Sequence, residues 1–478
     1  MHRCAFLFAL AVAIGTGTVD AALPHPVALA FRNAGVPLNA IGVVVQEVND
    51  TRPLFVQQPT ASYSPASVMK LITTFSALEI LGPAYRWKTS AYLDGTLEAG
   101  VLYGNLVLRG GGDPKITIEQ WQVFMKTLRA KGLAAVAGDL VLDRTFFAPG
   151  VHDASAFDGE PQKPYNVGPD ALLVNFKAVR FVFAPGPFAD TTLVTAEPAL
   201  MHVLVGARPT LSAGECGDWR AAIGATFVDR GGSARAEFTG RYPASCGEHD
   251  WWVSLLDHPA YVHGMFDTYF RAAGGRFAGG WKAGVAPAGA KPFATLESPP
   301  LWEIVRDVNK TSNNVMARQV FLTLATANAS QPATTARATA AVRQWLARRN
   351  LKIPELVLDN GSGLSRRERI SAGSLAKLLL AADASAVREE FVSSLAVAAM
   401  DGTLQRRFQN GTVAGQALLK TGTLEGVRAL AGYVIDNEGR RFVVVAIVNH
   451  PNAVRAQSAL DFLVQWVYRD AAGWTPPH

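Results

Sequence analysis

Strand- and helix-forming segments at the two ends of this 478-residue chain enclose a middle of different character. Residues 41–56 form a hairpin of two apolar strands joined by a polar turn, directly before an apolar helix. Near the other end, residues 426–449 contain two further strands, and a helix follows over 455–468. Between the ends, short strands punctuated by Gly and Pro continue to about residue 285. The pattern predicts one α/β domain built from both ends of the chain and interrupted by a large β-rich insertion.

The length of the chain also requires more than one hydrophobic core. Single cores stop growing at roughly 250–300 residues, and the composition, with 49% apolar and 18% charged residues, is that of a globular protein. We assign residues 22–92 and 289–478 to the two segments of the α/β domain. Residues 93–288 form the insertion, which is large enough for two small domains. In the second segment the apolar periodicity predicts helices over 298–305 (capped by Ser298), 313–324, 334–349 and 371–381.

The first 21 residues have the features of a secretory signal peptide. A short polar start at His2 and Arg3 precedes an apolar run over residues 4–14, and small residues precede the expected cleavage site. We expect cleavage after Ala21, with Ala22 almost as suitable, and export to the periplasm. The alternative is an N-terminal anchor helix, but a membrane span needs ~20 apolar residues and this run is shorter.

Only two of the three cysteines remain after cleavage, Cys216 and Cys246. An even number of cysteines in an exported protein predicts one disulfide between them. On the chain-entropy model, closing the loop between Cys216 and Cys246 stabilises the fold by roughly 3–4 kcal/mol. The alternative is a pair of buried thiols.

The formal net charge of +6 comes from basic residues scattered along the sequence. No long Lys/Arg run or alternation of basic and aromatic residues occurs, which argues against nucleic acid as a partner. A positive exported protein is weakly attracted to anionic polymers such as a cell wall, and we expect at most peripheral contact with a membrane surface.

The motif Ser67-Val68-Met69-Lys70 places a hydroxyl and an amine one helical turn apart. Residues three apart lie on the same face of a helix, so Lys70 can reach Ser67. A serine needs such a base nearby to act as a nucleophile at neutral pH, and the first turn of a helix favours developing negative charge. The same spacing recurs at Ser374 and Lys377, where we expect an ordinary helix start capped by Ser371.

Two further short motifs carry chemistry-bearing side chains. Ser312-Asn313-Asn314 places a second hydroxyl and a carboxamide, that of Asn314, at the start of a helix. Lys420-Thr421-Gly422-Thr423 lies on a predicted strand, where Lys420 and Thr421 point to opposite faces unless the strand bends at Gly422. Each triplet alone suits a helix cap or a strand end, but SxN and KTG each occur once in this chain.

The order SxxK, SxN, KTG resembles the signature of class A β-lactamases and penicillin-binding proteins. The chain is most similar to the D-alanyl-D-alanine carboxypeptidase/endopeptidase family, the class C penicillin-binding proteins. The 245-residue gap between Ser67 and Ser312 is typical of that family, whose insertion folds as extra domains beside the active site. Supporting stretches are residues 106–114, 164–166, 359–366 and 402–404, and within them Asn360 is a departure that shifts one loop residue.

The resemblance implies a penicillin-binding, β-lactamase-like serine transferase domain, an antiparallel sheet flanked by helices. It makes Ser67 the acylated nucleophile, Lys70 its general base and Ser312 the proton relay to the leaving group. For the base role, the pKa of Lys70 must fall from ~10.4 toward ~7–8. Asn314 orients the substrate and Lys70. On the KTG strand, the terminal carboxylate is held by Lys420 and Thr421, beside Gly422, and the oxyanion by the backbone N–H groups of Ser67 and Thr423.

The same resemblance implies the partners of the site. The substrates are peptidoglycan stem peptides ending in D-Ala-D-Ala or their crosslinks, β-lactams are inhibitors, and no cofactor or metal is implied. An acid from the insertion, Asp158, is a further candidate for contact with the substrate, as in some relatives.

Four other functions are alternatives to this hypothesis. A Ser-His-Asp hydrolase lacks its GxSxG elbow here, because Asn360 stands where Ser362 needs a glycine. A zinc peptidase lacks HExxH among the nine histidines. A penicillin-binding sensor or wall-binding scaffold would be acylated without turnover, and a β-lactamase would hydrolyse β-lactams rapidly. The balance between carboxypeptidase and endopeptidase action stays open.

Overall fold

One antiparallel sheet joins the two ends of the chain. The computed structural model describes residues 22–474 apart from 149, 327–330 and 410, so the expected signal peptide lies outside the described residues. The sheet has six strands in the order β19-β20-β21-β22-β1-β2, and β1 from the N-terminal segment pairs along its whole length with β22. Their bounds are β1 Ile41–Glu47, β2 Phe55–Gln57, β19 Ala396–Val397, β20 Ala417–Leu424, β21 Val427–Ile435 and β22 Arg441–Asn449.

Helices cover both faces of this sheet because its central strands are apolar on both sides. Successive strand residues point to opposite faces, so Val443, Val445 and Ile447 join one core while Val444 and Ala446 join the other. The second core lies under α1 (His25–Asn33) and α10 (Gln457–Asp470). The first contains α2 Lys70–Leu81, α5 Leu301–Thr311, α6 Asn314–Thr323, α7 Thr335–Arg348, α8 Ala372–Asp383 and α9 Arg388–Ser393.

The two ends of the inserted region together form a seven-stranded mixed sheet. Strand β4 pairs with β5 on one side and with β17 on the other, so the chain enters and leaves at neighbouring strands. Helices α3 (Ile118–Ala130) and α4 (His258–Ala272) pack on this sheet and on each other. Its strands are β4 Lys88–Glu98, β5 Val101–Arg109, β6 Ala135–Val136, β7 Leu140–Asp143, β15 Arg276–Phe277, β16 Trp281–Ala283 and β17 Ala294–Glu297.

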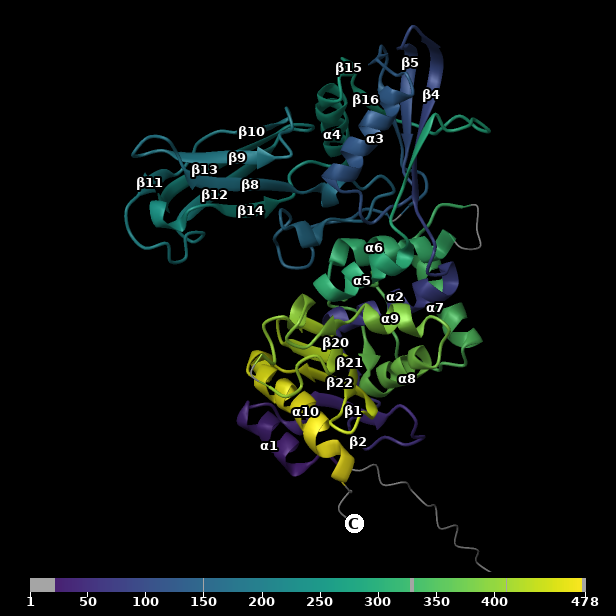
Figure 1. Ribbon diagram of the computed structural model, residues 1–478, viewed down its shortest axis with the longest axis vertical. Helices are drawn as coiled ribbons and strands as arrows, with labels where there is room; N and C mark the ends of the chain where they lie inside the picture. The colour runs from purple at the N-terminus through teal and green to yellow at the C-terminus, as the bar shows by residue number, and fades with distance from the viewer. Residues whose placement is uncertain (1–21, 149, 327–330, 410, 475–478) are drawn as a thin grey trace, which may run out of the picture.

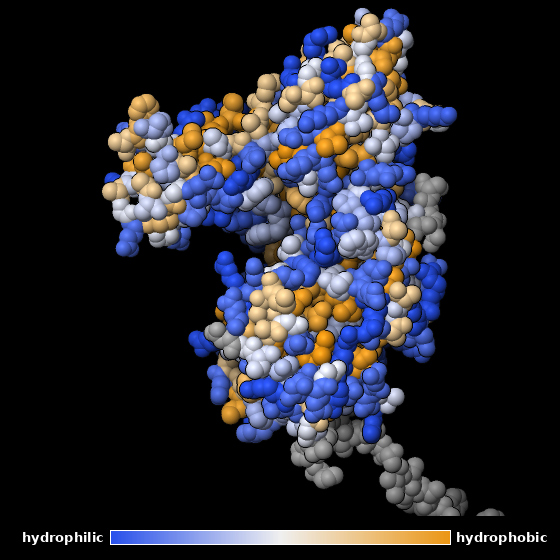
Figure 2. Space-filling model, viewed as in Figure 1, coloured by the Kyte–Doolittle hydropathy of each residue, from blue (hydrophilic) through white to orange (hydrophobic). Residues whose placement is uncertain are grey.

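A second part of the insertion projects sideways from the molecule, and we call residues 179–253 the arm (Figure 1). Two small sheets, β14-β8-β9 and a four-stranded sheet centred on β13, enclose an aromatic core that includes Phe181, Phe183 and Phe238. The surface is hollowed where the arm overhangs the α/β domain (Figure 2). The strands are β8 Val179–Pro185, β9 Thr192–Glu197, β10 Val203–Val205, β11 Thr210–Ser212, β12 Ile223–Asp229, β13 Ala234–Pro243 and β14 His249–Val253.

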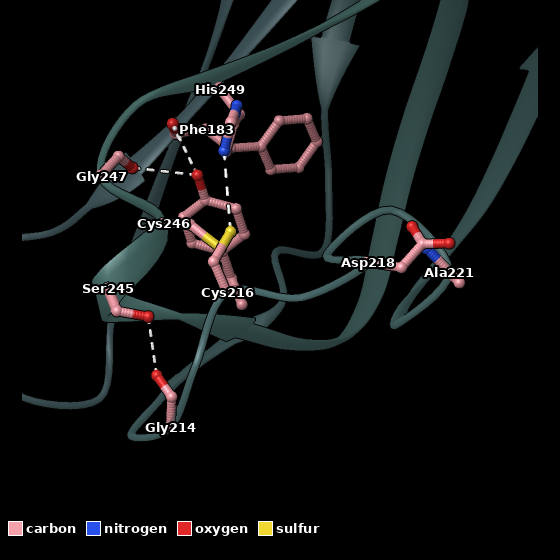
Figure 3. Close-up of a disulfide and its surroundings, with 10 residues drawn as sticks. Phe183, Gly214, Cys216, Asp218, Ala221, Ser245, Cys246, Gly247 and His249 are labelled. Atoms are coloured by element: carbon pink, nitrogen blue, oxygen red, sulfur yellow. Dashed lines mark hydrogen bonds between the residues drawn. A yellow bond between two sulfur atoms is a disulfide. The ribbon is translucent and has the colours of Figure 1, made fainter.

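The arm contains the expected disulfide between Cys216 and Cys246 (Figure 3). It ties the loop before β12 to the turn after β13, and Ser245 Oγ adds a hydrogen bond of 2.7 Å to the carbonyl of Gly214 across the same two segments. His249 lies beside the bridge, with Nε2 3.7 Å from Cys216 Sγ. The bridge confirms the predicted pairing over the alternative of free thiols.

The order of strands and helices agrees with the sequence pattern, but the predicted cap of one helix is wrong. Ser298 does not cap a helix: α5 begins after Pro300, and Ser298 Oγ accepts from the Trp87 backbone N–H at 2.9 Å. The insertion is β-rich, and α3 and α4 add helical residues to its core. Within the described residues, no helix is both long enough and apolar enough to cross a membrane.

Candidate active site

The Ser67 hydroxyl lies on a tight turn at the entrance of α2. Residues Ala66–Met69 form a 3₁₀ turn, so Ser67 precedes the α-helix instead of lying in its first turn, and Lys70 is the first residue of α2. Ala66 has a φ of 47°, a left-handed backbone that is uncommon for a non-glycine residue. Gly363 and Gly422 leave room for this turn, because a Cβ at Gly422 would lie 2.8 Å from the Pro65 carbonyl.

Lys70 is fully buried and lies in contact with three oxygens. Its Nζ is 3.0 Å from Ser67 Oγ, 2.6 Å from Asn314 Oδ1 and 2.5 Å from the Ser362 carbonyl. A neutral amine has two N–H groups and one lone pair. The two carbonyl oxygens accept the N–H groups, which leaves the lone pair for the Ser67 hydroxyl proton.

The surroundings of Lys70 favour that neutral form. Burial, and then the positive charge of Lys420, lower the pKa of Lys70 well below its usual value. Glu368 opposes this effect and Arg318 adds to it. This shift has the direction that the predicted role of Lys70 as a base requires.

Ser312 and Lys420 form a second hydroxyl–amine pair. Ser312 lies between α5 and α6 with a φ of 60°, which turns its side chain out of the helical path. Lys420 Nζ donates to Ser312 Oγ at 2.9 Å and to its neighbour's carbonyl, that of Thr421, at 3.0 Å. Lys420 is fully buried, and burial lowers its pKa to about 7.

The residues of this site form two layers. Lys70 and Lys420 are buried, whereas Ser67, Ser312 and Thr421 are partly exposed. Thr421 Oγ1 lies 2.8 Å from Thr403 Oγ1, and Thr423, further along β20, is exposed. A substrate therefore meets hydroxyl groups first, with two amines behind them. These side chains come from segments more than 300 residues apart in the sequence.

The loop of residues 359–363 is a component that the motif analysis did not assign to catalysis. Its Ser362 carbonyl contacts Lys70, and its Gly361 carbonyl accepts from Thr73 Oγ1 at 2.7 Å. Asn360 Oδ1 accepts from the Ser362 backbone N–H at 2.9 Å, so the departure noted in the sequence helps to shape the loop. The Asp-Asn-Gly-Ser-Gly composition predicts a turn, but backbone carbonyls carry no sequence signal for their role.

Asp158 lies in the loop that precedes Pro164–Asn166. It is exposed, and its carboxylate accepts from Tyr165 Oη at 2.8 Å and from Asn166 Nδ2 at 2.7 Å. The preceding residue, Phe157, packs near Ala66 in a small apolar cluster. The loop thus reaches the edge of the nucleophile turn through Phe157, while Asp158 is engaged in hydrogen bonds within its own loop.

The second SxxK pair provides an internal contrast. Ser371 Oγ caps α8 by accepting from the Ser374 backbone N–H at 3.1 Å, as predicted. Ser374 Oγ donates to Glu355 at 2.6 Å, and Lys377 is exposed. The spacing alone therefore does not make a site.

Among the described residues, one group of three potential metal ligands lies close together, namely Cys216, Cys246 and His249. Both sulfurs of that group are used in the disulfide, and the group lies in the arm. The zinc-peptidase alternative finds no support there.

A serine beside a buried amine, a second serine–lysine pair and a KTG strand in a helix-covered antiparallel sheet define the penicillin-binding class of serine acyl-enzymes. Comparison with known proteins identifies the family within this class. The model of the D-Ala-D-Ala carboxypeptidase 3 (S13) family matches residues 28–469. The chain belongs to this family.

Individual relatives agree with this assignment. The chain is 29% identical over 453 residues to the D-alanyl-D-alanine carboxypeptidase of Actinomadura sp. (strain R39), covering 91% of this chain and 82% of that protein. The crystal structure of penicillin binding protein 4 (dacB) from Haemophilus influenzae matches with a TM-score of 0.77 and 20% identity, covering 93% of this chain and all of that one. A predatory endopeptidase of Bdellovibrio bacteriovorus matches with a TM-score of 0.52 and 17% identity over 91% and 93% of the two chains. The predicted family, fold class and serine-peptidase class are confirmed.

Proposed function

We propose that Ser67 is the nucleophile and Lys70 the general base of a D-alanyl-D-alanine carboxypeptidase that also cleaves peptidoglycan crosslinks. The observation that carries this assignment is the 3.0 Å contact between Ser67 Oγ and a buried amine whose other two contacts are carbonyl oxygens. A positioned base of this kind contributes on the order of 10²–10⁴-fold to a proton-transfer step.

Acylation begins when Ser67 Oγ attacks the carbonyl carbon of the penultimate D-alanine. The hydroxyl proton passes to the lone pair of Lys70 Nζ as the Oγ–C bond forms. The carbonyl oxygen becomes an oxyanion, which the backbone N–H groups of Ser67 and Thr423 hold. One such donor is typically worth ~2.7–4 kcal/mol.

Collapse of the tetrahedral intermediate breaks the peptide bond and expels the amine of the terminal residue. The proton that Lys70 took from Ser67 passes to this amine through the hydroxyl of Ser312, whose Oγ accepts a hydrogen bond from Lys420. Lys70 is then neutral again. Asn314 orients the arriving peptide with its amide nitrogen while its Oδ1 holds Lys70. Water then attacks the acyl carbon and gives one proton to neutral Lys70. The Oγ–C bond breaks, the acid leaves, and Lys70 returns this proton to Ser67 Oγ, 3.0 Å away.

Lys420 and Thr421 hold the terminal carboxylate of the substrate, beside Gly422. Burial lowers the pKa of Lys420 to about 7 in the empty site, and an arriving carboxylate favours its charged form. Carboxypeptidase and endopeptidase action share this chemistry and differ in what the leaving amine carries.

The stem-peptide side chains face the loop that contains Phe157 and Asp158. Phe157 packs near Ala66, and the Arg366 guanidinium lies 4.8 Å from the centre of its ring. For Asp158 to contact the substrate directly, it would have to release Tyr165 or Asn166. We therefore place Asp158 at the rim of the site, as a residue that holds the loop when no substrate is bound.

The proposed location is the periplasm, with residues 1–21 removed as a signal peptide. The disulfide supports export, because such bonds persist in oxidising compartments. We retain residues 22–92 and 289–478 as the two segments of the catalytic domain and 93–288 as the insertion, with β4 crossing the first of these boundaries.

Two experiments test the proposal. Mass spectrometry of penicillin-treated protein is expected to find one adduct, on Ser67, and an adduct on another residue contradicts the assignment. Digestion of purified peptidoglycan is expected to release D-alanine and uncrosslinked peptides, with Ser67→Ala as the blank. Labelling without product release indicates a sensor, and rapid penicillin hydrolysis indicates a β-lactamase.

A further inference from the structure

A buried glutamate, Glu368, lies behind the catalytic loop. Its side chain is fully buried, and a single oxygen, Oε1, accepts three backbone N–H groups. The donors are Asp359 at 3.2 Å, Asn360 at 3.0 Å and Gly361 at 2.8 Å. These are the residues directly before Ser362, so Glu368 fixes the loop that presents its carbonyl to Lys70.

The other carboxylate oxygen of Glu368, Oε2, is buried and has no hydrogen-bond partner among the described residues. A protonated carboxyl would leave a buried O–H donor without an acceptor. An ionised carboxylate would lack one hydrogen bond, but three N–H donors on Oε1 stabilise its charge. Burying an ion costs several kcal/mol, so positive groups nearby are needed to offset it.

Two such groups lie on helices near Glu368. Arg318 on α6 and Lys70 on α2 are at most 5% exposed, and the charge of Glu368 raises the pKa of both. Arg318 donates to the Val167 carbonyl at 2.8 Å and has no carboxylate partner within hydrogen-bond distance among the described residues. Asp359, the nearest other acid, is ion-paired to Arg367 at the surface.

We propose that Glu368 is a positioning residue of the active site, an ionised carboxylate that holds the 359–363 loop against Lys70 and balances the charge of Arg318. With the charge of Arg318 balanced in this way, burial and the charge of Lys420 are left to hold Lys70 in its neutral form. The proposal rests on the proposed roles of Ser67 and Lys70. A neutral side chain could anchor the same loop, but only an ionised Glu368 also places a negative charge there.

The negative charge of Glu368 changes the pKa of Lys70 in a definite direction. Burial and Lys420 lower the pKa of Lys70, and Glu368 raises it. Burial raises the pKa of Glu368 itself, against the opposing effect of its three N–H donors. Removal of its charge should therefore lower the pKa of Lys70 further, and acylation should persist to lower pH.

The test compares variants that separate the charge from the loop anchor. Glu368→Gln keeps an acceptor oxygen and removes the charge, Glu368→Asp keeps the charge and shortens the side chain, and Glu368→Ala removes both. The second-order rate constant for acylation by a fluorescent penicillin is measured from pH 4 to 10. We expect Glu368→Gln to move the acid limb down by on the order of one pH unit, and Glu368→Ala to reduce the optimal rate at least about tenfold.

Glu355→Gln is the matched control. Glu355 also anchors backbone and hydroxyl donors, at Ser371 and Ser374, but outside the site, and its substitution should leave the profile unchanged. An acid limb in Glu368→Gln that coincides with wild type overturns the charge role. Wild-type rates in Glu368→Ala overturn the positioning role. If Glu368→Ala does not fold, Glu368→Asp provides that second comparison. Wild-type protein that takes no label on Ser67 contradicts the proposed function instead.

Discussion

The catalytic region and the arm differ in where their charged side chains lie: buried in the first and exposed in the second. In the catalytic region Lys70, Lys420 and Glu368 are fully buried. In the arm, Arg180 on β8 pairs with Glu197 and Asp250, and these two acids expose 58% and 42% of their side chains. The first arrangement costs solvation energy that the second avoids.

The difference shows that the fold gives up stability in the region that carries the function. Buried amines have strongly lowered pKa values, which is what a serine needs from its base. The arm has no comparable group in its aromatic core, and it gains stability from Phe181, Phe183 and Phe238 and from a covalent bridge. We expect substitutions in the two regions to separate activity from stability.

The largest effect is expected from Lys70→Met. Removing the base should reduce acylation by a fluorescent penicillin on the order of 10²–10⁴-fold. The free energy of unfolding should be unchanged or higher, because an apolar side chain of similar length no longer carries a buried polar group. Acylation kinetics and urea unfolding measure the two quantities on the same protein.

Lys377→Met is the control for this change, because Lys377 has the same SxxK spacing but is exposed. It should retain wild-type acylation. A Lys70→Met protein that acylates at the wild-type rate would remove Lys70 from the mechanism, whatever its stability.

In the arm, the double variant Cys216→Ser, Cys246→Ser should show the reverse pattern. Opening a loop with a 30-residue separation should lower the unfolding free energy of the arm by roughly 3–4 kcal/mol. Acylation by penicillin should stay within about twofold of wild type, because this reaction is completed by residues outside the arm. Calorimetry and limited proteolysis followed by mass spectrometry locate the change.

Ser245→Ala is the matched control, since it removes a hydrogen bond across the same two segments and keeps the bridge. Its effect on unfolding should be much smaller. A tenfold loss of penicillin acylation in the double variant would show that the two regions are coupled.

The pH dependence of peptide cleavage tests whether Lys420 must be positively charged to bind the substrate. Lys420 must be positive to hold a carboxylate, and burial lowers its pKa to about 7. A lysine is charged below its pKa, so kcat/KM for a D-Ala-D-Ala peptide should fall as pH rises above about 7, approaching tenfold per unit. The acid limb belongs to Lys70, whose pKa is lowered well below its usual value by burial and by Lys420. A profile that is flat to pH 10 would contradict this role of Lys420.

The sequence predicts the parts of this molecule that local patterns specify. The strands of the central sheet follow from apolar runs over residues 41–48 and 442–449, and the three motifs identify five of the polar side chains that meet at the site. Helix α3 was missed although Thr117 and Gln120 form a capping box and apolar residues recur at helical spacing. Flanking Gly-rich strands obscured that signal.

Other features depend on tertiary contacts that no local pattern contains. Ser298 lies in a good capping context, but the neighbouring chain at Trp87 uses its hydroxyl. The Ser362 carbonyl and the Glu368 carboxylate gain their roles because the fold brings residues 359–368 against α2. Sequence reasoning finds functional side chains by type and spacing, whereas backbone groups and anchors need the assembled structure.

The smallest effect is expected for Arg180→Gln, which breaks the exposed charge cluster on the arm. Exposed ion pairs contribute little because water and salt screen them. The melting temperature should stay within about 2 °C of wild type, and the small difference should shrink further in high salt. If Arg180→Gln destabilised the arm as much as loss of the disulfide does, surface charge would be a main source of its stability. Exposed charges in the arm would then matter for stability, and the contrast with the buried charges of the catalytic region would fail.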